Sequence, residues 1–395
     1  MDSNLSSNIT PEEQPVATAT SRKRISIGLP RNTDASERRF PLTPEGVSRL
    51  IEKGYAVKIE HEAAAPIHYS DNAYSRQGAE LTDRHAALSC DIVINLSTLQ
   101  PADIRKMRRG AMLLTLLCPD RLHAETVREM QRMAIVGVAV NNISDERGNM
   151  PFADILAEID GRAAIATASS LLADASAGKG ILLGGIAGLN PCEVTVIGSG
   201  IAAIAASRSA LGLGAIVRMF DDDVYSLRAA VRDLGPGVIA SSLHERVLTS
   251  ALRTADVVVA TPVQTKLTVG ADDIEIMKKG VVIFDLDQVH GRVFPSLPTV
   301  DLAIAIDAPG KAEGKRVCHV NAGSAVPRTA AMALSNTFIT MLDSIITCEG
   351  LTNALKLTPG LRRGVFTFLG KITNPQVART AGCRFTDINI FLQLS

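Results

Sequence analysis

The stretch VIGSGIAAIAASRSALGLGAIVRMFDDD (residues 196–223) decides the fold of its half of the chain. A strand-like apolar run leads into a G-x-G-x-x-A turn, and an alanine-rich helix follows. In such a turn the first glycine permits a tight bend and the second lets the backbone approach a pyrophosphate. The small third residue lets the helix pack closely on the strand, and the helix amino end favours an anion. The predicted pyrophosphate-binding residues are Gly198, Ser199, Gly200, Ile201 and Ala203.

A second strand ends at Asp221, roughly 20 residues after the turn, where dinucleotide folds place the carboxylate that binds the ribose 2′-hydroxyl. An acid at this position favours NAD(H) over NADP(H), although Arg218 lies nearby in sequence. A lone G-x-G-x-x-A is a weak signal, and the alternative is a tight strand–helix turn that binds nothing. The preceding strand, the following helix and Asp221 together favour an NAD(H) site.

Length and composition describe a globular protein of two ordinary domains. The 395 residues are 46% apolar and 21% charged, which is typical of a chain that buries a sizeable core. Basic and acidic residues number 41 each, so no strong overall field attracts nucleic acid or an anionic membrane. We therefore expect a small-molecule partner, with neither nucleic acid nor membrane.

The six cysteines are scattered, without a C-x-x-C pair or a metal-ligand spacing, which indicates a reducing compartment and no metal site. Residues 1–23 are polar and lack the apolar run of a secretion signal, so they predict a disordered tail. No apolar run approaches the roughly 20 residues that span a bilayer. These features predict a soluble, cytoplasmic protein.

Strand-like and helix-like segments alternate along most of the chain, which predicts an α/β fold. A helix is expected after Thr43, its candidate N-cap. A long alanine-rich helix is expected over residues 152–176, and mostly helix is expected after Pro327. Continuous apolar runs of strand length are typical of parallel sheets covered on both faces. The expected strands are 24–30, 55–61, 91–97, 110–118 and 133–141, then 193–199, 215–221, 256–262, 280–286 and 301–307.

Four segments resemble the alanine dehydrogenase and transhydrogenase α-subunit family. They are GLPRNTDASERRFPLTPEGV (28–47), KGILLGGIAGLNPCEVTVIGSGIAA (179–203), NAGSAVPRTAAMALSN (321–336) and LGKITNPQVARTAGCRFTDI (369–388). The last resembles the soluble alanine dehydrogenases more than the membrane-linked transhydrogenases. The resemblance implies a homo-oligomer, dimer or hexamer. It also implies two Rossmann-like domains with a cleft between them: a nucleotide domain (151–327) inserted in a substrate domain (24–150 and 328–395).

The resemblance also implies roles for three residues. Arg39 falls where the family grips the substrate carboxylate, a task that suits the fork of a guanidinium; the alternative is a surface charge. Asp287 falls beside the nicotinamide ribose and the reacting carbon, unless it only caps a strand end. Asn321 matches an asparagine near the nicotinamide, with the same alternative of a purely structural role.

Two positions depart from the alanine dehydrogenases. Ser97 stands where they carry a lysine, and it either donates a hydrogen bond to substrate or is an ordinary loop serine. Cys118 stands where they carry a proton-relaying histidine; a neutral thiol is a poor general acid, and the alternative is a buried apolar filler. His290, three residues after Asp287, can supply the proton instead, unless it is an exposed loop histidine.

These residues predict an NAD(H)-dependent oxidoreductase that transfers hydride to or from the amine or imine carbon of an amino or imino acid. The missing lysine and histidine favour a preformed secondary or cyclic imine over pyruvate plus ammonia. The alternative is an NAD-binding protein of the same fold with little or no dehydrogenase activity, although neither Arg39 nor Asp287 is needed to bind NAD alone. A transhydrogenase-like component is a third, less favoured interpretation.

Overall fold

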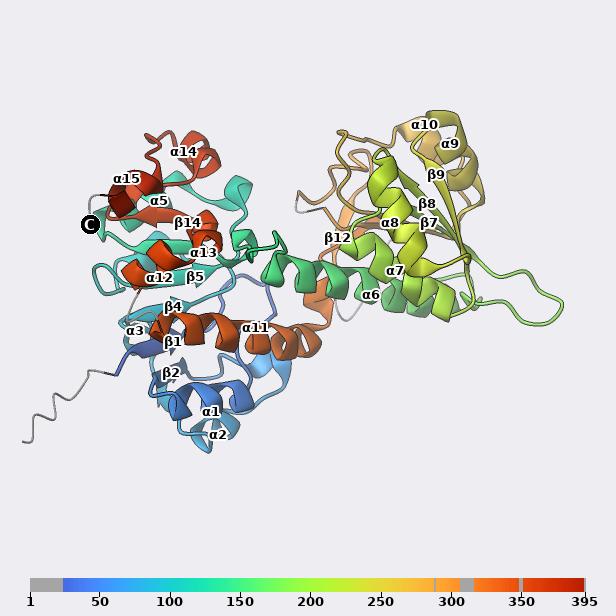
Figure 1. Cartoon of the computed structure of the whole chain (residues 1–395). Helices are drawn as coiled ribbons and strands as arrows, with labels where there is room; N and C mark the ends of the chain where they lie inside the picture. The colour runs from blue at the N-terminus through green and yellow to red at the C-terminus, as the bar shows by residue number, and fades with distance from the viewer. Residues whose placement is uncertain (1–23, 288, 306–315, 348–350, 394–395) are drawn as a thin grey trace, which may run out of the picture.

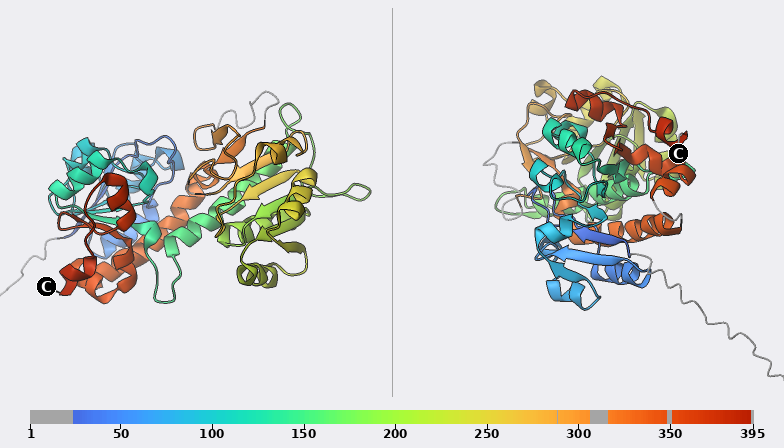
Figure 2. Two further views of the ribbon diagram at one scale, coloured as in Figure 1. Left: turned by 90° about the horizontal axis from the view of Figure 1, so that it is seen from above. Right: turned by 90° about the vertical axis from the view of Figure 1, so that its left-hand side faces the viewer.

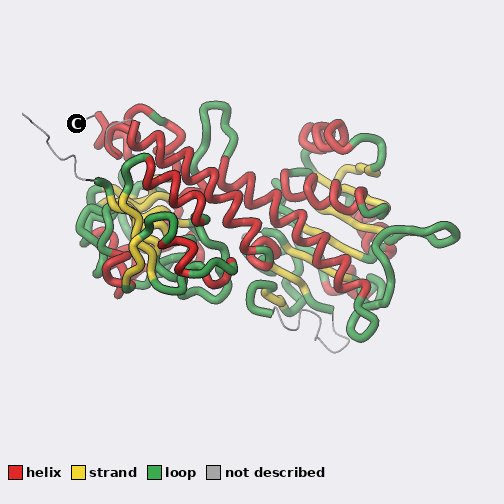
Figure 3. The backbone as a smooth tube through the Cα atoms, turned by 90° about the horizontal axis from the view of Figure 1, so that it is seen from below, coloured by secondary structure: helices red, strands yellow, loops and turns green. Residues whose placement is uncertain are grey.

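The computed structural model describes residues 24–287, 289–305, 316–347 and 351–393, so the predicted tail lies outside the described residues. Two α/β lobes are joined by helix α6 (Pro151–Ala173), and helix α11 (Pro327–Thr347) runs beside its first half (Figure 1). Figure 2 shows α6 passing between the lobes from above, and Figure 3 shows these long helices from below. The expected fold class, two parallel-sheet α/β units, is confirmed. Among the described helices, none has the length and apolar character needed to cross a membrane.

The first lobe is built on an eight-stranded sheet with the order β15-β14-β6-β5-β4-β1-β2-β3. Strands β1 to β6 pair in parallel, whereas β14 pairs antiparallel with β6 and β15. Strands β4, β5 and β6 are buried along their whole length, as in a sheet with helices on both faces. The strands are β1 (Ser26–Leu29), β2 (Ala56–Glu60), β3 (Glu80–Thr82), β4 (Ile92–Ile94), β5 (Met112–Thr115), β6 (Val136–Ala139), β14 (Val365–Phe368) and β15 (Lys371–Ile372).

The helices of this lobe follow the expected local signals. Helix α1 begins where Thr43 Oγ1 accepts the Gly46 N–H at 3.3 Å, with Pro44 at the first helical position. The α-helices of the lobe besides α6 and α11 are α1 (Pro44–Glu52), α2 (Asp71–Ser75), α3 (Arg84–Leu88), α4 (Pro101–Ile104), α5 (Ala124–Arg132), α12 (Leu351–Leu357), α13 (Pro359–Gly364), α14 (Pro375–Ala381) and α15 (Ile388–Gln393). Short 3₁₀ turns include η1 (Ala65–Ile67), η2 (Pro119–Arg121) and η3 (Val140–Asn142).

The second lobe is built on a seven-stranded parallel sheet with the order β12-β13-β11-β10-β7-β8-β9. Its strands are β7 (Glu193–Ile197), β8 (Ile216–Asp221), β9 (Val238–Ser242), β10 (Val257–Ala260), β11 (Val282–Asp285), β12 (Thr299–Asp301) and β13 (Cys318–Val320). Its helical segments are α7 (Ile201–Gly212), α8 (Val224–Leu234), α9 (Glu245–Thr254), α10 (Ala271–Glu275) and the 3₁₀ turn η4 (Ala322–Ala325).

One expectation about local structure was wrong, and several short strands were not expected. The strand expected over 301–307 ends at Asp301, because its side chain and carbonyl accept the N–H groups of Ala303 and Ala305, both at 2.9 Å, and turn the chain. The segment after Pro327 is mostly helical, as expected, and it also contains β14 and β15, which form a hairpin that extends the first sheet. Strands β3, β9, β13, β14 and β15 were not expected.

Helix α6 belongs to both hydrophobic cores. Its first half places Phe152 in the core of the first lobe, with the ring centroid 4.7 Å from that of Phe338 on α11. Its second half places Ala168 in the core of the second lobe. Between the halves, a Cβ on Gly161 would lie 2.1 Å from the carbonyl oxygen of Ala202. Helices α6 and α7 are therefore in backbone contact, and the arrangement of the lobes depends on this glycine.

We predict that Gly161→Ala lowers the free energy of unfolding by about 1–3 kcal/mol, as overpacking does, despite the better helix propensity of alanine. The matched control is Gly212→Ala at the end of α7, where a Cβ meets no atom within 4 Å. Urea denaturation of both variants measures the difference. If Gly161→Ala loses no more free energy of unfolding than Gly212→Ala does, the close contact between α6 and α7 is contradicted.

Candidate functional site

Each sheet has a central place on either side of which successive strands are added in opposite directions. In the first sheet this place lies between β1 and β4, and in the second sheet between β7 and β10. Ligands of open α/β sheets bind in the crevice beyond the carboxyl ends of the strands at such points. The loops that contain Arg39 and Ser97 follow β1 and β4, and the G-x-G-x-x-A turn follows β7. Arg39, Ser97 and the residues of the G-x-G-x-x-A turn therefore lie at the positions where open α/β sheets bind their ligands.

The turn after β7 has the geometry that a pyrophosphate site needs. Gly198 has a φ of 101°, and a Cβ there would lie 2.0 Å from the hydroxyl of Thr261, which follows β10. Gly200 caps helix α7, and a Cβ there would meet no atom within 4 Å. Within helix α7, the Ala203 side chain is fully buried and the Ile201 side chain is exposed. The open space over the amino end of α7 is the space that an anion requires.

Asp221 is bound to the turn itself. The Ser199 hydroxyl donates to Asp221 Oδ2 at 2.6 Å, and the Asp223 N–H donates to Oδ1 at 2.9 Å. Asp222 lies between these two acids, so three carboxylates follow one another at the end of β8. The structure thus brings Ser199 and Asp221 together, a contact that the separation in sequence did not reveal.

Arg218 does not belong to this acidic end. Because residues alternate between the faces of a strand, Arg218 and Asp221 lie on opposite faces of β8. The Arg218 Nε lies 3.2 Å from Glu193 Oε2, toward the other end of the sheet.

Arg39 is held in the first lobe by a carboxylate that the sequence analysis did not single out. Its Nε donates to Glu37 Oε1 at 2.8 Å, and one terminal nitrogen donates to Glu37 Oε2. The side chains are 13% and 9% exposed, so this is a nearly buried ion pair and not a surface charge. The only signal in the sequence was that Glu37 precedes Arg39 by two residues.

Asp160 of α6 lies beside this ion pair and was also missed. Its Oδ1 accepts the Gly323 N–H at 2.7 Å, and a Cβ on Gly323 would lie 2.2 Å from the same oxygen. Burial raises the pKa of Asp160, and the charge of Glu37 adds to this effect, whereas Arg39 and the Gly323 N–H oppose it. Arg39 is therefore bonded to one carboxylate and interacts electrostatically with a second carboxyl group.

Asn321 links the lobes. It has the left-handed backbone conformation (φ 62°), which asparagine tolerates better than most residues. Its Nδ2 donates to the carbonyl oxygen of Ser36 at 2.5 Å and to Asp301 Oδ1 at 3.1 Å. The loop before Arg39 is thereby bonded to the second lobe.

Asp287 and His290 lie in the loop after β11. Asp287 accepts from Arg292 Nε at 3.0 Å and from the Val289 N–H at 3.1 Å. His290 Nδ1 lies 2.8 Å from a terminal nitrogen of Arg121. A guanidinium only donates, so this imidazole nitrogen accepts and the proton of the neutral ring is on Nε2.

His290 is half-buried, not an exposed loop residue. Burial lowers its pKa, and the positive charges of Arg121 and Arg39 lower it further, whereas Asp301 and Asp287 raise it. The contact with Arg121 brings the loop of His290, in the second lobe, against the turn after β5 in the first lobe. A neutral imidazole with one nitrogen occupied by Arg121 is a weak candidate for the proton donor.

Cys118 begins the turn that carries Arg121, since the Arg121 N–H donates to the Cys118 carbonyl at 3.0 Å. The structure therefore brings the loops of Cys118 and His290 together through Arg121. Cys118 is half-buried, and within the described ranges its thiol has no hydrogen bond. Sequence proximity to Cys118 was the one available signal for Arg121.

Ser97 takes part in a chain of hydrogen bonds inside the first lobe. Its hydroxyl donates to Asn32 Oδ1 and accepts from Asn95 Nδ2 at 3.2 Å. Asn32 in turn donates to the Glu37 carbonyl at 2.8 Å. Ser97 is 8% exposed, so these bonds engage its hydroxyl in shaping the loop that carries Arg39.

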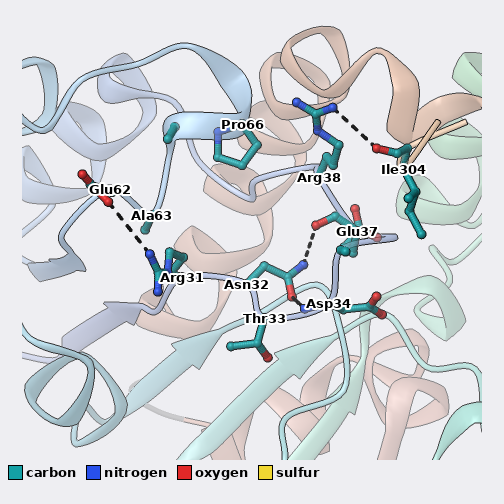
Figure 4. Close-up of a pocket in the computed structure, with 13 residues that line it drawn as sticks. Arg31, Asn32, Thr33, Asp34, Glu37, Arg38, Glu62, Ala63, Pro66 and Ile304 are labelled. Atoms are coloured by element: carbon teal, nitrogen blue, oxygen red, sulfur yellow. Dashed lines mark hydrogen bonds and ion pairs between the residues drawn. The ribbon is translucent and has the colours of Figure 1, made fainter. Parts of the chain in front are cut away.

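A cavity of about 460 Å³ opens beside this loop (Figure 4). Arg38 lines it, and its Nη1 lies 3.5 Å from the carbonyl oxygen of Ala303 in the second lobe. The cavity thus has walls from both lobes. Its lining residues are Arg31, Asn32, Thr33, Asp34, Ala35, Glu37, Arg38, Glu62, Ala63, Ala65, Pro66, Ala303 and Ile304.

Comparison with known proteins gives consistent matches. Residues 28–160 match the family model of the alanine dehydrogenase/PNT N-terminal domain, and residues 164–375 match that of the C-terminal domain. The alanine dehydrogenase of Bacillus subtilis (strain 168) is 30% identical over 380 residues, which cover 93% of this chain and 97% of that protein. The alanine dehydrogenase of Geobacillus stearothermophilus is 28% identical over 376 residues, with coverage of 93% and 100%.

Two solved structures share the fold. An L-alanine dehydrogenase aligns with a TM-score of 0.75 at 24% identity, over 90% of this chain and 99% of that one. A transhydrogenase from Sinorhizobium meliloti aligns with a TM-score of 0.68 at 18% identity, over 88% and 99%. The expectation of Rossmann-like lobes is thereby confirmed, and the chain belongs to the alanine dehydrogenase/PNT family.

Proposed function

We propose that this chain is an NAD(H)-dependent oxidoreductase that transfers hydride to or from the amine or imine carbon of a small amino or imino acid. The observation that carries the proposal is a nearly buried arginine, Arg39, whose loop is bonded to the lobe with the dinucleotide turn by Asn321. Family membership and relatives named alanine dehydrogenase support the same class of reaction. They do not favour an NAD-binding protein without dehydrogenase activity.

The second lobe fits the dinucleotide, because the turn is open where a Cβ on Gly200 would point. In this proposal Gly198, Ser199, Gly200, Ile201 and Ala203 surround the pyrophosphate. Asp221 binds the adenosine ribose, while Asp287 and Asn321 lie at the nicotinamide end. Bound NAD(H) supplies or accepts the hydride, and the protein orients the substrate carbon toward it.

Arg39 orients the substrate through its carboxylate. A guanidinium has five N–H donors, and Glu37 accepts from two of the nitrogens. The remaining donors are available to a carboxylate, and the Glu37 pair fixes the plane of the fork before substrate arrives. A second cation at position 97 is missing, so the substrate is bound by fewer charges than in the alanine dehydrogenases that the sequence resembles.

Two replacements in the first lobe favour a preformed imine as the substrate of the proposed reaction. Ser97 and Cys118 replace the groups that the family uses to handle ammonia chemistry. A secondary or cyclic imine, which already contains its C=N bond, needs less of that assistance.

The domain boundaries (24–150 and 328–395, with 151–327 inserted) remain part of this proposal. Membership of the strands in two separate sheets supports them. A homo-oligomer, dimer or hexamer, rests on the family resemblance alone.

We predict that Gly200→Ala leaves the stability unchanged but weakens NADH binding at least about tenfold, because a methyl group would occupy the pyrophosphate space. Gly198→Ala loses both stability and binding, since its φ of 101° and the contact with Thr261 exclude a Cβ. Fluorescence titration with NADH and thermal melts separate the two effects. Full NADH affinity in Gly200→Ala would show that the dinucleotide does not bind at this turn.

We predict that NADH binds at least about tenfold tighter than NADPH, because a 2′-phosphate would meet the three carboxylates at the end of β8. Asp221→Asn narrows this preference by removing a charge and a ribose acceptor. Arg218→Ala is the control, because Arg218 pairs with Glu193 on the other face. Equal affinity of the wild type for both coenzymes would overturn the assignment.

We predict that the purified protein oxidises NADH with preformed cyclic imines or bulky keto acids plus amines, and more slowly with pyruvate plus ammonia. Arg39→Met abolishes turnover on each active substrate while NADH affinity is kept, since Arg39 lies in the first lobe. Initial rates over a substrate panel provide the measurement. Rapid turnover of pyruvate would identify an ordinary alanine dehydrogenase, and no turnover with intact NADH binding would overturn the proposed reaction.

A further inference from the structure

We propose that Asp160 is a catalytic residue of the proposed reaction, the group that exchanges a proton with the substrate nitrogen. The inference rests on the proposed amine–imine chemistry and deepens it. Neither of the two residues that the sequence offered for this task, Cys118 and His290, is well arranged for it. His290 accepts from Arg121, and Cys118 carries a thiol in a turn of the first lobe.

The position of Asp160 follows from its place on α6. The residue lies between the half of the helix that packs in the first core and the half that packs in the second. Its carboxyl group accepts from Gly323, which follows Asn321, and Asn321 is bonded to the loop of Arg39. The charge of Arg39 also acts on this carboxyl group, which therefore lies at the junction of the lobes. Asn321 is proposed to lie at the nicotinamide end.

This position matches the shape of the substrate. In an α-amino or α-imino acid the nitrogen is attached to the carbon that bears the carboxylate. A carboxylate held by Arg39 therefore presents its nitrogen to groups close to Arg39. Asp160 Oδ1 is engaged by Gly323, and within the described residues no hydrogen bond is made by Oδ2. One oxygen fixes the side chain and the other is available to the nitrogen.

The electrostatic surroundings suit a proton carrier. The charged side chains that act on the pKa of Asp160 are Glu37, which raises it together with burial, and Arg39, which lowers it. On the same helix, Glu158 and Arg162 pair with each other at 2.7 Å on the exposed side. Helix α7 presents Ala202 at the crossing, and Arg328 of α11 stacks 4.6 Å from the ring centroid of Tyr69.

In the proposed step, hydride transfer to the carbon is coupled to proton transfer to the nitrogen. In the direction of reduction, the imine carbon accepts hydride from NADH while the C=N π pair becomes a lone pair on nitrogen. The carboxyl O–H of Asp160 breaks and its proton forms the new N–H bond. The products are the amine, NAD⁺ and the Asp160 carboxylate, which is reprotonated from water. In oxidation the same carboxylate removes the N–H proton from the neutral amine as hydride leaves the adjacent carbon, which forms the C=N bond and regenerates the protonated carboxyl group.

Asp160→Asn tests this role, since the amide oxygen keeps the acceptor for Gly323 and the proton is lost. We expect turnover of the active imine to fall about 100-fold or more, the usual contribution of a general acid, with unchanged NADH affinity. In the wild type, kcat/KM for reduction falls as pH rises through the pKa of Asp160, because only the protonated carboxyl is an acid. This fall of kcat/KM with rising pH is absent from the Asp160→Asn variant.

Glu158→Gln is the matched control, because it removes an exposed carboxylate two residues earlier on the same helix. The rate and the pH profile of this variant should equal those of the wild type.

An infrared difference spectrum of the free proteins gives a readout without turnover. We expect a protonated carboxyl band that is present in the wild type and absent from Asp160→Asn. An active wild type with an unaffected Asp160→Asn variant overturns the role of Asp160 alone. A wild type that binds NADH but reduces no imine overturns the proposed function, and this inference with it. If Asp160→Asn does not fold, the test rests on the wild-type protein alone. A wild-type kcat/KM that does not change with pH, together with no protonated carboxyl band in the wild-type infrared spectrum, overturns the proposal.

Discussion

The contact between α6 and α7 at Gly161 is the constraint on which the rest of the structure depends. A helix that belongs to two cores fixes how the lobes face each other, and only a residue without a side chain lets α6 approach Ala202 this closely. Asp160 precedes Gly161 directly, so the same crossing places its carboxyl group between the lobes. The bonds from Asn321 to Ser36 and from Gly323 to Asp160 then connect the dinucleotide lobe with the loop of Arg39.

Charge at this junction is arranged around Arg39. Burying a guanidinium is costly unless a carboxylate compensates it with good geometry, and Glu37 supplies a two-point contact. Asp160 adds a second carboxyl group whose ionised form burial disfavours. One fixed cation and one carboxyl group whose neutral form burial favours suit the two tasks that the proposed amine–imine chemistry requires, binding a carboxylate and exchanging a proton.

The dinucleotide turn, the α/β alternation and the N-cap of α1 could be predicted because each depends on residues close together in sequence. Asp160 and Glu37 could not, since their importance comes from contacts with Gly323 and Arg39 that only the packed lobes create. The β14–β15 hairpin was missed for a related reason: its two short strands are stabilised by pairing with β6, more than two hundred residues earlier in the chain. The roles of Ser97, Cys118 and Asp287 stay predictions.

The hairpin at the end of the chain also affects the order in which the protein is built during synthesis. The sheet of the second lobe draws its strands from one continuous stretch, residues 193–320. The sheet of the first lobe begins at β1 but receives β14 and β15 only after residue 372 has been made. Because domains fold as their segments emerge from the ribosome, the edge of β6 waits unpaired while the whole dinucleotide lobe forms. A nascent chain therefore has all the strands of the second sheet before it has all the strands of the first.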